Sequence, residues 1–275
     1  MLAMSRNSTL APTLLTIVAG WGIVATTVVV FLVYRNETDP DKRAILSMGV
    51  SLIVIWCVLG GIAMRLARDR LVRLARKLKI DWRVRFVLLC IAMAMLEEAV
   101  TTSLTNAAPL FGAVTDAARI TASKNYLEVV LFHSVIAFVP MFICWGWLLH
   151  RYAFTPAEVV LLFGLNGTLA ETLSFGPQNL LQVGMWVYVY GLMVYLPAHT
   201  APTDRSARPV HLRHWILATF LPLVFVIPLA VFVLVRILLF IWRGVSKALR
   251  LRHSGTAINA PEHRNSSSRP TSDCQ

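Results

Sequence analysis

Two adjacent carboxylates, Glu97 and Glu98, interrupt a segment that is otherwise apolar, residues 86–103. One charged side chain near the centre of a lipid bilayer costs at least about 2.5–3.5 kcal/mol, and two like charges in contact cannot both ionise cheaply. A chain retains such a pair where it faces a polar cavity, shares protons or binds a cation. We therefore expect at least one of the two to be protonated at neutral pH, with the other helices arranged around the pair.

Three more polar side chains stand inside apolar segments further along the chain: His133, Asn166 and Glu171. With a rise of 1.5 Å per residue, Glu98 lies about 8–10 Å below the outer end of its segment and His133 about 9 Å below the start of the next. Asn166 and Glu171 lie about 13 and 6 Å below the same side. Three helices thus carry polar groups at similar depth. We predict that these side chains converge on one polar cavity, with Glu171 at its outer rim.

Small and hydroxyl residues accompany this set. Thr101, Thr102 and Thr105 extend the polar stripe beside the glutamate pair, while Gly164 and Gly167 precede Glu171 on its own helix face and leave room for a neighbour or a ligand. Each polar residue also has a simpler interpretation. A membrane histidine is often hydrogen-bonded to a neighbouring helix, an asparagine can join two helices, and a glutamate near the interface can extend towards water.

Two other carboxylates are assigned to helix capping. The run Thr155-Pro156-Ala157-Glu158 is a capping box with proline at the first helical position, so Glu158 is expected to cap the segment that follows it. Asn125 and Glu128 are assigned the same role at the start of the preceding segment. These carboxylates are therefore left out of the candidate site.

The order of the candidate residues resembles that of a known family. The CAAX-protease and bacteriocin-processing superfamily of intramembrane glutamic peptidases carries Glu-Glu-x-x-x-Arg on one helix, Phe-x-x-x-His on a second and His-x-x-x-Asn on a third. This chain has Glu97-Glu98, His133 and Asn166 in that order, over residues 95–170. The resemblance implies that one glutamate activates water as a general base, and that His133 and Asn166 stabilise the oxyanion.

The sequence departs from the family pattern at three positions. Thr102 or Ser103 stands at the arginine position, Val129 at the phenylalanine position and Leu162 at the final histidine position. Glu171, just over one helical turn past Asn166, could replace the missing histidine, and it completes the candidate catalytic set.

The composition is that of a membrane protein. Hydrophobic residues make up 57% of the 275 residues, charged residues only 15%, and the mean hydropathy is +0.65, whereas soluble domains carry about 25% charged residues. The net charge of +12 comes from basic residues clustered between apolar runs, a pattern that encodes topology and contact with anionic lipids. It indicates a lipid bilayer as partner and no nucleic acid.

The four cysteines, Cys57, Cys90, Cys144 and Cys274, have no spacing that predicts a disulfide or a zinc site.

The expected fold is all-α, a polytopic transmembrane helix bundle with about seven spans. The expected spans cover residues 11–34, 44–64, 86–103, 127–149, 156–175, 179–196 and 215–242. Residues 65–85 alternate basic and apolar side chains, which predicts an amphipathic helix in the plane of the membrane on its cytoplasmic side. The transmembrane domain is expected to extend over residues 1–250, and the polar tail, 251–275, to be disordered.

Charge sets the expected orientation. With residues 65–85 in the cytoplasm, alternation also puts the N-terminus, the turn at Arg151 and the linker 205–213 inside, and the loops 35–43, 104–126 and 176–178 outside. Seven spans would leave the basic residues after 242 outside, against the usual tendency, so the topology of the tail stays open. We expect an integral, multi-pass protein of a plasma or inner membrane.

Three functional interpretations remain open on the sequence alone. The first is a peptidase-like hydrolase acting on a membrane-embedded peptide, with Glu97, Glu98, His133, Asn166 and Glu171 as the candidate catalytic residues. The second is a small proton- or cation-coupled transporter of a small molecule. The third is a scaffold that uses these groups for helix packing. Nothing in the sequence specifies a cofactor or a metal.

Overall fold

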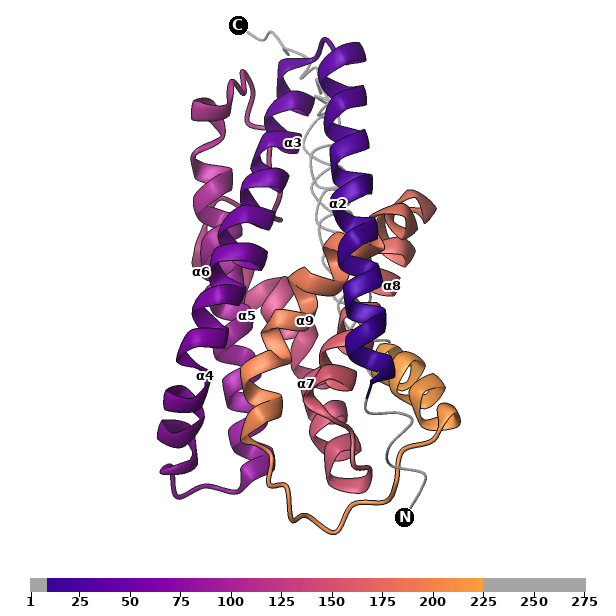
Figure 1. Ribbon diagram of the computed structural model, residues 1–275. Coiled ribbons are helices and arrows are strands. Elements are labelled where there is room, and N and C mark those ends of the chain that lie inside the picture. The colour runs from indigo at the N-terminus through magenta and orange to yellow at the C-terminus, as the bar shows by residue number, and fades with distance from the viewer. Residues whose placement is uncertain (1–8, 225–275) are drawn as a thin grey trace, which may run out of the picture. The chain divides into compact units, whose positions relative to one another are not determined.

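The structure is a computed structural model that describes residues 9–224, and these residues form helices joined by short connections (Figure 1). The elements are α2 (Leu10–Asn36), α3 (Pro40–Leu52), η1 (Ile53–Gly60), α4 (Gly61–Arg76), α5 (Trp82–Asn106), η2 (Ala108–Phe111), α6 (Tyr126–Phe132), α7 (Ser134–Arg151), α8 (Pro156–Phe175), η3 (Pro177–Gln182) and α9 (Val183–Thr200). A further helix begins at Leu212 and is described to Val224. The predicted all-α bundle is confirmed. Most of the expected span 215–242 and the tail 251–275 lie outside the described residues.

Among the described residues, four helical stretches are long and apolar enough to cross a membrane: Leu10–Asn36, Pro40–Arg76, Tyr126–Arg151 and Pro177–Thr200. α5 and α8 have comparable lengths of 25 and 20 residues but carry the glutamates discussed below. Each of the first six expected spans falls within one of these helices or helical stretches. The chain is therefore built from helices suited to a lipid environment.

Local sequence signals determine where several helices begin. Thr155 and Glu158 form the predicted capping box at the start of α8, with each side chain hydrogen-bonded to the backbone of the other. The Asn125 side chain accepts hydrogen bonds from the N–H groups of Leu127 and Glu128 and so caps α6. These contacts satisfy N–H groups that would otherwise lack partners at a helix start. The capping roles predicted for Glu158 and Asn125 are confirmed. The Glu128 carboxylate instead accepts a hydrogen bond from the Ser123 hydroxyl at 2.7 Å.

The second long helix differs from the prediction in its boundaries. α3, η1 and α4 follow one another without a break, and η1 is a π-helical stretch of eight residues. The expected basic helix over 65–85 is instead divided: residues 65–76 continue the long helix, and α5 begins at Trp82 with Asp81 as its cap. No proline stands between Gly61 and Arg76, so nothing in the backbone ends the helix at the membrane boundary.

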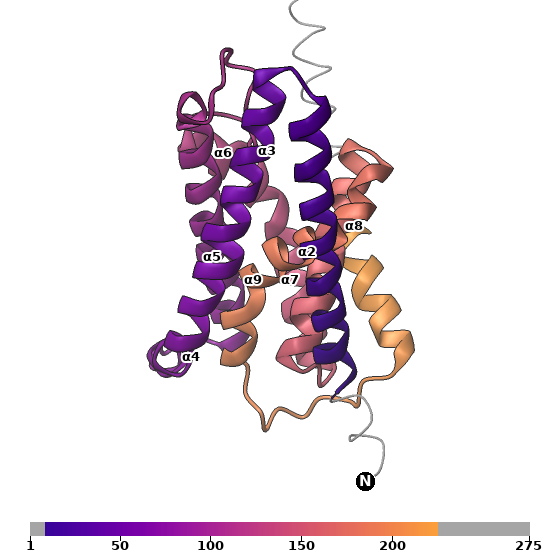
Figure 2. The same cartoon turned by 45° about the horizontal axis from the view of Figure 1, so that its top comes forward.

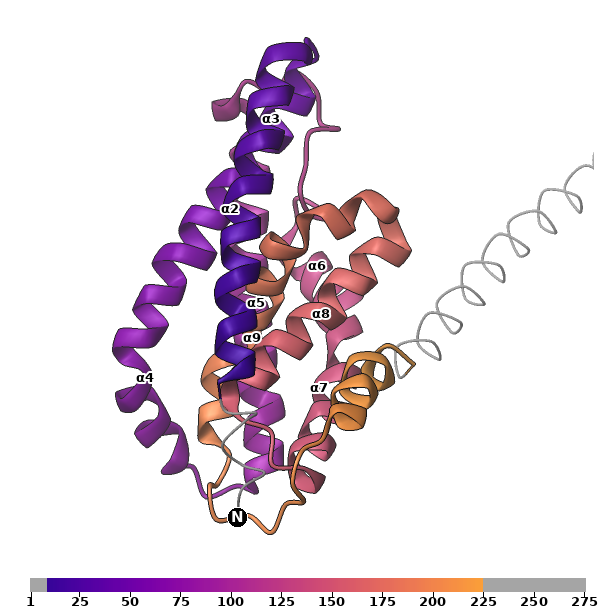
Figure 3. The same cartoon turned by 45° about the vertical axis from the view of Figure 1, so that its right-hand side comes forward.

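α9 lies in the middle of the bundle and packs against α2, α4, α5 and α8 (Figures 2 and 3). The largest fully buried aromatic side chains come from η1, α5, α7 and α8, and they are Trp56, Phe86, Phe142, Trp145 and Phe163. The rings of Phe142 and Phe163 stack with their centroids 5.4 Å apart and join α7 to α8. Both α5 and α8 pack against α9, so α9 connects the helices that carry the candidate site.

Glycines bring α8 and α9 into backbone contact. A side chain at Gly164 would overlap the backbone of Val187, and one at Gly167 would overlap the ring of Tyr190. The space predicted beside these two glycines is therefore filled by α9 itself. The neighbouring helix is the occupant, and no room for a ligand is left there.

Arginines donate hydrogen bonds to helix ends at one end of the bundle. The Arg76 guanidinium bonds to the carbonyl of His199 in the last turn of α9 at 3.0 Å, and Arg205 bonds to that of Leu149 in the last turn of α7 at 2.9 Å. Carbonyls of a last helical turn lack partners within the helix and favour positive charge. The connections that follow α4, α7 and α9 therefore share one end of the bundle, the lower end in Figure 1.

Candidate functional site

Three glutamates and a tyrosine gather where α5, α8 and α9 meet. Glu97 and Glu98 of α5 are 4% and 5% exposed, and Glu171 of α8 is half-buried. The three carboxylates lie within electrostatic range of one another. The hydroxyl of Tyr190 on α9 donates a hydrogen bond to Glu171. We call Glu97, Glu98, Glu171 and Tyr190 the carboxylate cluster.

Hydroxyl groups surround the Glu98 carboxylate. The Thr101 hydroxyl donates to it at 3.0 Å and the Thr121 hydroxyl, from the connection between α5 and α6, at 3.4 Å. Thr102 follows Glu98 by one helical turn and therefore lies on the same face of α5. Its hydroxyl is buried and has no hydrogen-bond partner within the described residues. The polar stripe predicted along α5 is present, and it is lined by donors rather than by cations.

His133 does not lie inside a helix. α6 ends and α7 begins at this residue, which is outside the helical conformation with φ −126° and ψ −105°. Its side chain is 43% exposed, and Nε2 lies 3.8 Å from a carboxylate oxygen of Glu128, which is also exposed. Within residues 9–224 no hydrogen bond or ion pair joins His133 to Glu97 or Glu98.

We therefore expect His133→Ala to change stability little. An exposed ion pair contributes about 0–1 kcal/mol, so the thermal unfolding midpoint of the purified protein should stay close to that of the wild type. Glu128→Gln, which removes the other partner, serves as the matched variant and should behave alike. A large loss of stability in His133→Ala alone would mean that the imidazole is part of the buried network.

Asn166 joins three helices and does not contact the carboxylate cluster through its amide. Its Oδ1 accepts a hydrogen bond from the Trp145 indole at 2.8 Å, and its Nδ2 donates to the carbonyls of Ala218 at 3.2 Å and Thr219. The side chain is fully buried. Both amide hydrogens are engaged, so no donor remains for an oxyanion. The interpretation of Asn166 as a link between helices is confirmed.

The structure thus assembles part of the predicted set. It brings Glu97, Glu98 and Glu171 together, and it leaves His133 at the surface and Asn166 with other partners. Tyr190 is the residue that sequence reasoning missed. Its signal was available, because a tyrosine inside an apolar segment usually finds a hydrogen-bond partner for its hydroxyl when buried.

The carboxylate cluster does not have the arrangement of ligands that a metal site requires. Among residues 9–224 no group of three or more histidine, cysteine, aspartate or glutamate side chains is placed to hold a metal ion. Cys57, Cys90 and Cys144 are free thiols, and Cys274 lies outside the described residues. Carboxylates beside hydroxyl donors, without a cation, can share and exchange protons.

Searches with protein-family models, curated proteins and solved structures find no match to this chain.

Proposed function

We propose that this chain is a multi-pass integral membrane protein whose carboxylate cluster binds and releases protons as part of a small proton-coupled carrier. The observation that carries the proposal is the cluster itself. Three carboxylates on α5 and α8, which both pack against α9, share one polar region, and no described lysine or arginine forms an ion pair with any of them. Such groups avoid the cost of burial when they take up protons.

The multi-pass part of the proposal rests on the helices and on their outer surface. Large apolar side chains are exposed along several of them, including Ile23, Phe31, Leu66, Phe132 and Leu173. Apolar surface of this extent suits contact with lipid chains. The basic connections share one end of the bundle, which we assign to the cytoplasmic side of a plasma or inner membrane.

A glutamic peptidase-like hydrolase, the activity implied by the resemblance, is the second candidate. It is favoured by the adjacent, buried Glu97 and Glu98, of which Glu98 would act as general base. Acyl transfer also needs donors for the oxyanion, and the Asn166 amide is already committed to other partners. The carrier is therefore the better supported of the two.

Proton flux into proteoliposomes tests the carrier. We expect wild-type protein to carry protons along an imposed pH gradient, reported by a pH-sensitive dye inside the vesicles. Tyr190→Phe keeps the ring that packs on Gly167 and removes only the hydroxyl. It should slow the flux about tenfold or more, because a hydrogen bond to a charged group contributes about 1.5–3 kcal/mol. Glu97→Gln and Glu98→Gln should lower the flux further.

Glu128→Gln provides the matched control, since it removes an exposed carboxylate outside the cluster. It should leave the flux unchanged. Equal flux in wild type, Glu97→Gln and Glu98→Gln would refute the proposal. Cleavage of a membrane-embedded peptide that is lost in Glu98→Gln and kept in Glu128→Gln would support the hydrolase instead.

A further inference from the structure

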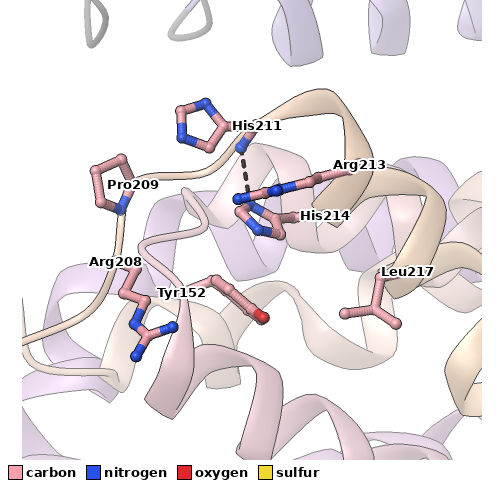
Figure 4. A pocket seen from close by; sticks show the side chains of 7 residues that line it. All are labelled: Tyr152, Arg208, Pro209, His211, Arg213, His214 and Leu217. Atoms are coloured by element: carbon pink, nitrogen blue, oxygen red, sulfur yellow. Dashed lines mark hydrogen bonds between the residues drawn. The ribbon is translucent and has the colours of Figure 1, made fainter.

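A basic pocket opens beside the end of α7 and the start of the helix Leu212–Val224 (Figure 4). Its volume is about 490 Å³. The lining side chains are Tyr152, Arg208, Pro209, His211, Arg213, His214 and Leu217. Two guanidinium groups and two imidazoles thus surround the pocket, and no carboxylate lines it. This charge pattern calls for an anionic occupant.

The backbone around the pocket is held by hydrogen bonds. The Arg208 N–H donates to the carbonyl of Arg151 at 3.0 Å, and the Ala153 N–H donates to the carbonyl of Arg208 at 2.9 Å. The side chains of Arg208 and Arg213 are exposed, and neither guanidinium forms a hydrogen bond or an ion pair with another described residue. The backbone around the pocket is therefore held in place, and the guanidinium groups of Arg208 and Arg213 are available to bind a ligand.

His214 supplies a third donor from a buried position. Its ring is stacked on Tyr152 with centroids 4.2 Å apart, and the residue is 8% exposed. Its Nδ1 accepts a hydrogen bond from the His211 N–H at 3.0 Å (Figure 4). The proton of the neutral ring is consequently on Nε2, which has no hydrogen-bond partner among the described residues. The first N–H groups of the helix Leu212–Val224 lie at the same place, and free N–H groups at a helix start favour anions.

We propose that this pocket binds the phosphate group of an anionic membrane lipid. The guanidinium groups of Arg208 and Arg213 donate hydrogen bonds to the phosphate oxygens. The Nε2–H group of His214 donates from the buried side of the pocket. Leu212, Ile216 and Phe220 are exposed and follow one another at a spacing of four residues, so they form one apolar helix face beside the pocket. That face takes the acyl chains. The inference requires the membrane placement proposed above but not proton binding, so the two can fail separately.

Binding of phosphatidylglycerol to the full chain in detergent micelles tests the pocket, with phosphatidylcholine, which is zwitterionic and has no net charge, as the comparison. We expect one tightly bound phosphatidylglycerol per chain by native mass spectrometry. Arg208→Gln and Arg213→Gln should each weaken it about tenfold, which corresponds to about 1.4 kcal/mol. Both side chains are exposed, so the thermal unfolding midpoint without lipid should not change.

Arg70→Gln is the matched control, because it removes an exposed arginine of α4 that lies outside the pocket. It should leave the affinity unchanged. Equal weakening in all three variants would reveal general surface attraction and overturn the proposal. Inorganic phosphate alone, added without lipid, should bind far more weakly than phosphatidylglycerol. Equal affinity for the two would identify a free-phosphate site and overturn the assignment to a lipid.

Discussion

Gly164→Ala should strongly destabilise the bundle. A Cβ atom at this position would stand 2.7 Å from the Cα atom of Val187 and would overlap the carbonyl oxygen of the same residue. These are backbone atoms of α9, and no rotamer change can move them away. We expect a loss of about 3 kcal/mol or more, the upper part of the range for overpacking. Thermal unfolding in detergent would measure it.

Gly20→Ala makes the same change in α2, where nothing lies within 4 Å of the added atom. Alanine is a better helix former than glycine by about 1 kcal/mol, so this control should unfold at the same temperature or higher. If both variants unfold together, α8 and α9 do not meet as described. Comparing Gly164→Ala with Gly20→Ala therefore separates the cost of the lost helix contact from the effect of helix propensity on stability.

Asn166→Asp is expected to be the most damaging isosteric change. The new carboxylate would keep the bond from Trp145, but its second oxygen would face the carbonyls of Ala218 and Thr219, which accept from the amide at present. A buried charge without a partner costs about 3–5 kcal/mol. The yield of folded protein and its unfolding midpoint should both fall sharply.

The same substitution at Asn125 should be harmless. Asn125 accepts hydrogen bonds from the first N–H groups of α6, and aspartate caps a helix as well as asparagine does. Trp145→Phe gives an intermediate case, since it removes a single hydrogen bond to Asn166, worth about 0.5–1.5 kcal/mol. Tolerance of Asn166→Asp would show that its amide is not committed to helix contacts and would reopen an oxyanion role.

Helix existence and capping could be predicted because both depend on neighbours in sequence. Thr155 and Glu158 interact across a single turn, and the rise per residue sets the depth of Glu97, Glu98 and Glu171 along their axes. The structure places these three carboxylates within electrostatic range of one another. The estimate of their depth required no knowledge of the helix packing.

The direction in which each side chain points around its helix axis could not be predicted in the same way. Asn166 has a depth that suits the cluster, yet its partners come from α7 and from the helix Leu212–Val224. The depth assigned to His133 assumed a continuous helix, whereas the helix breaks at that residue. Gly167 was expected to leave room for a neighbour or a ligand, and the Tyr190 ring of α9 is that neighbour. These outcomes depend on contacts between segments far apart in the chain.

The π-helical stretch η1 sets the rotational phase between the two halves of one long helix. α3 packs against α5 and η2, whereas α4 packs against α9, and Trp56 within η1 is anchored by a hydrogen bond to the carbonyl of Val189. Successive α-helical residues are turned by about 100°. Losing or gaining one residue within Ile53–Gly60 would therefore turn every side chain of α4 away from α9. For the contact between α4 and α9, the number of residues in this stretch therefore matters more than their types.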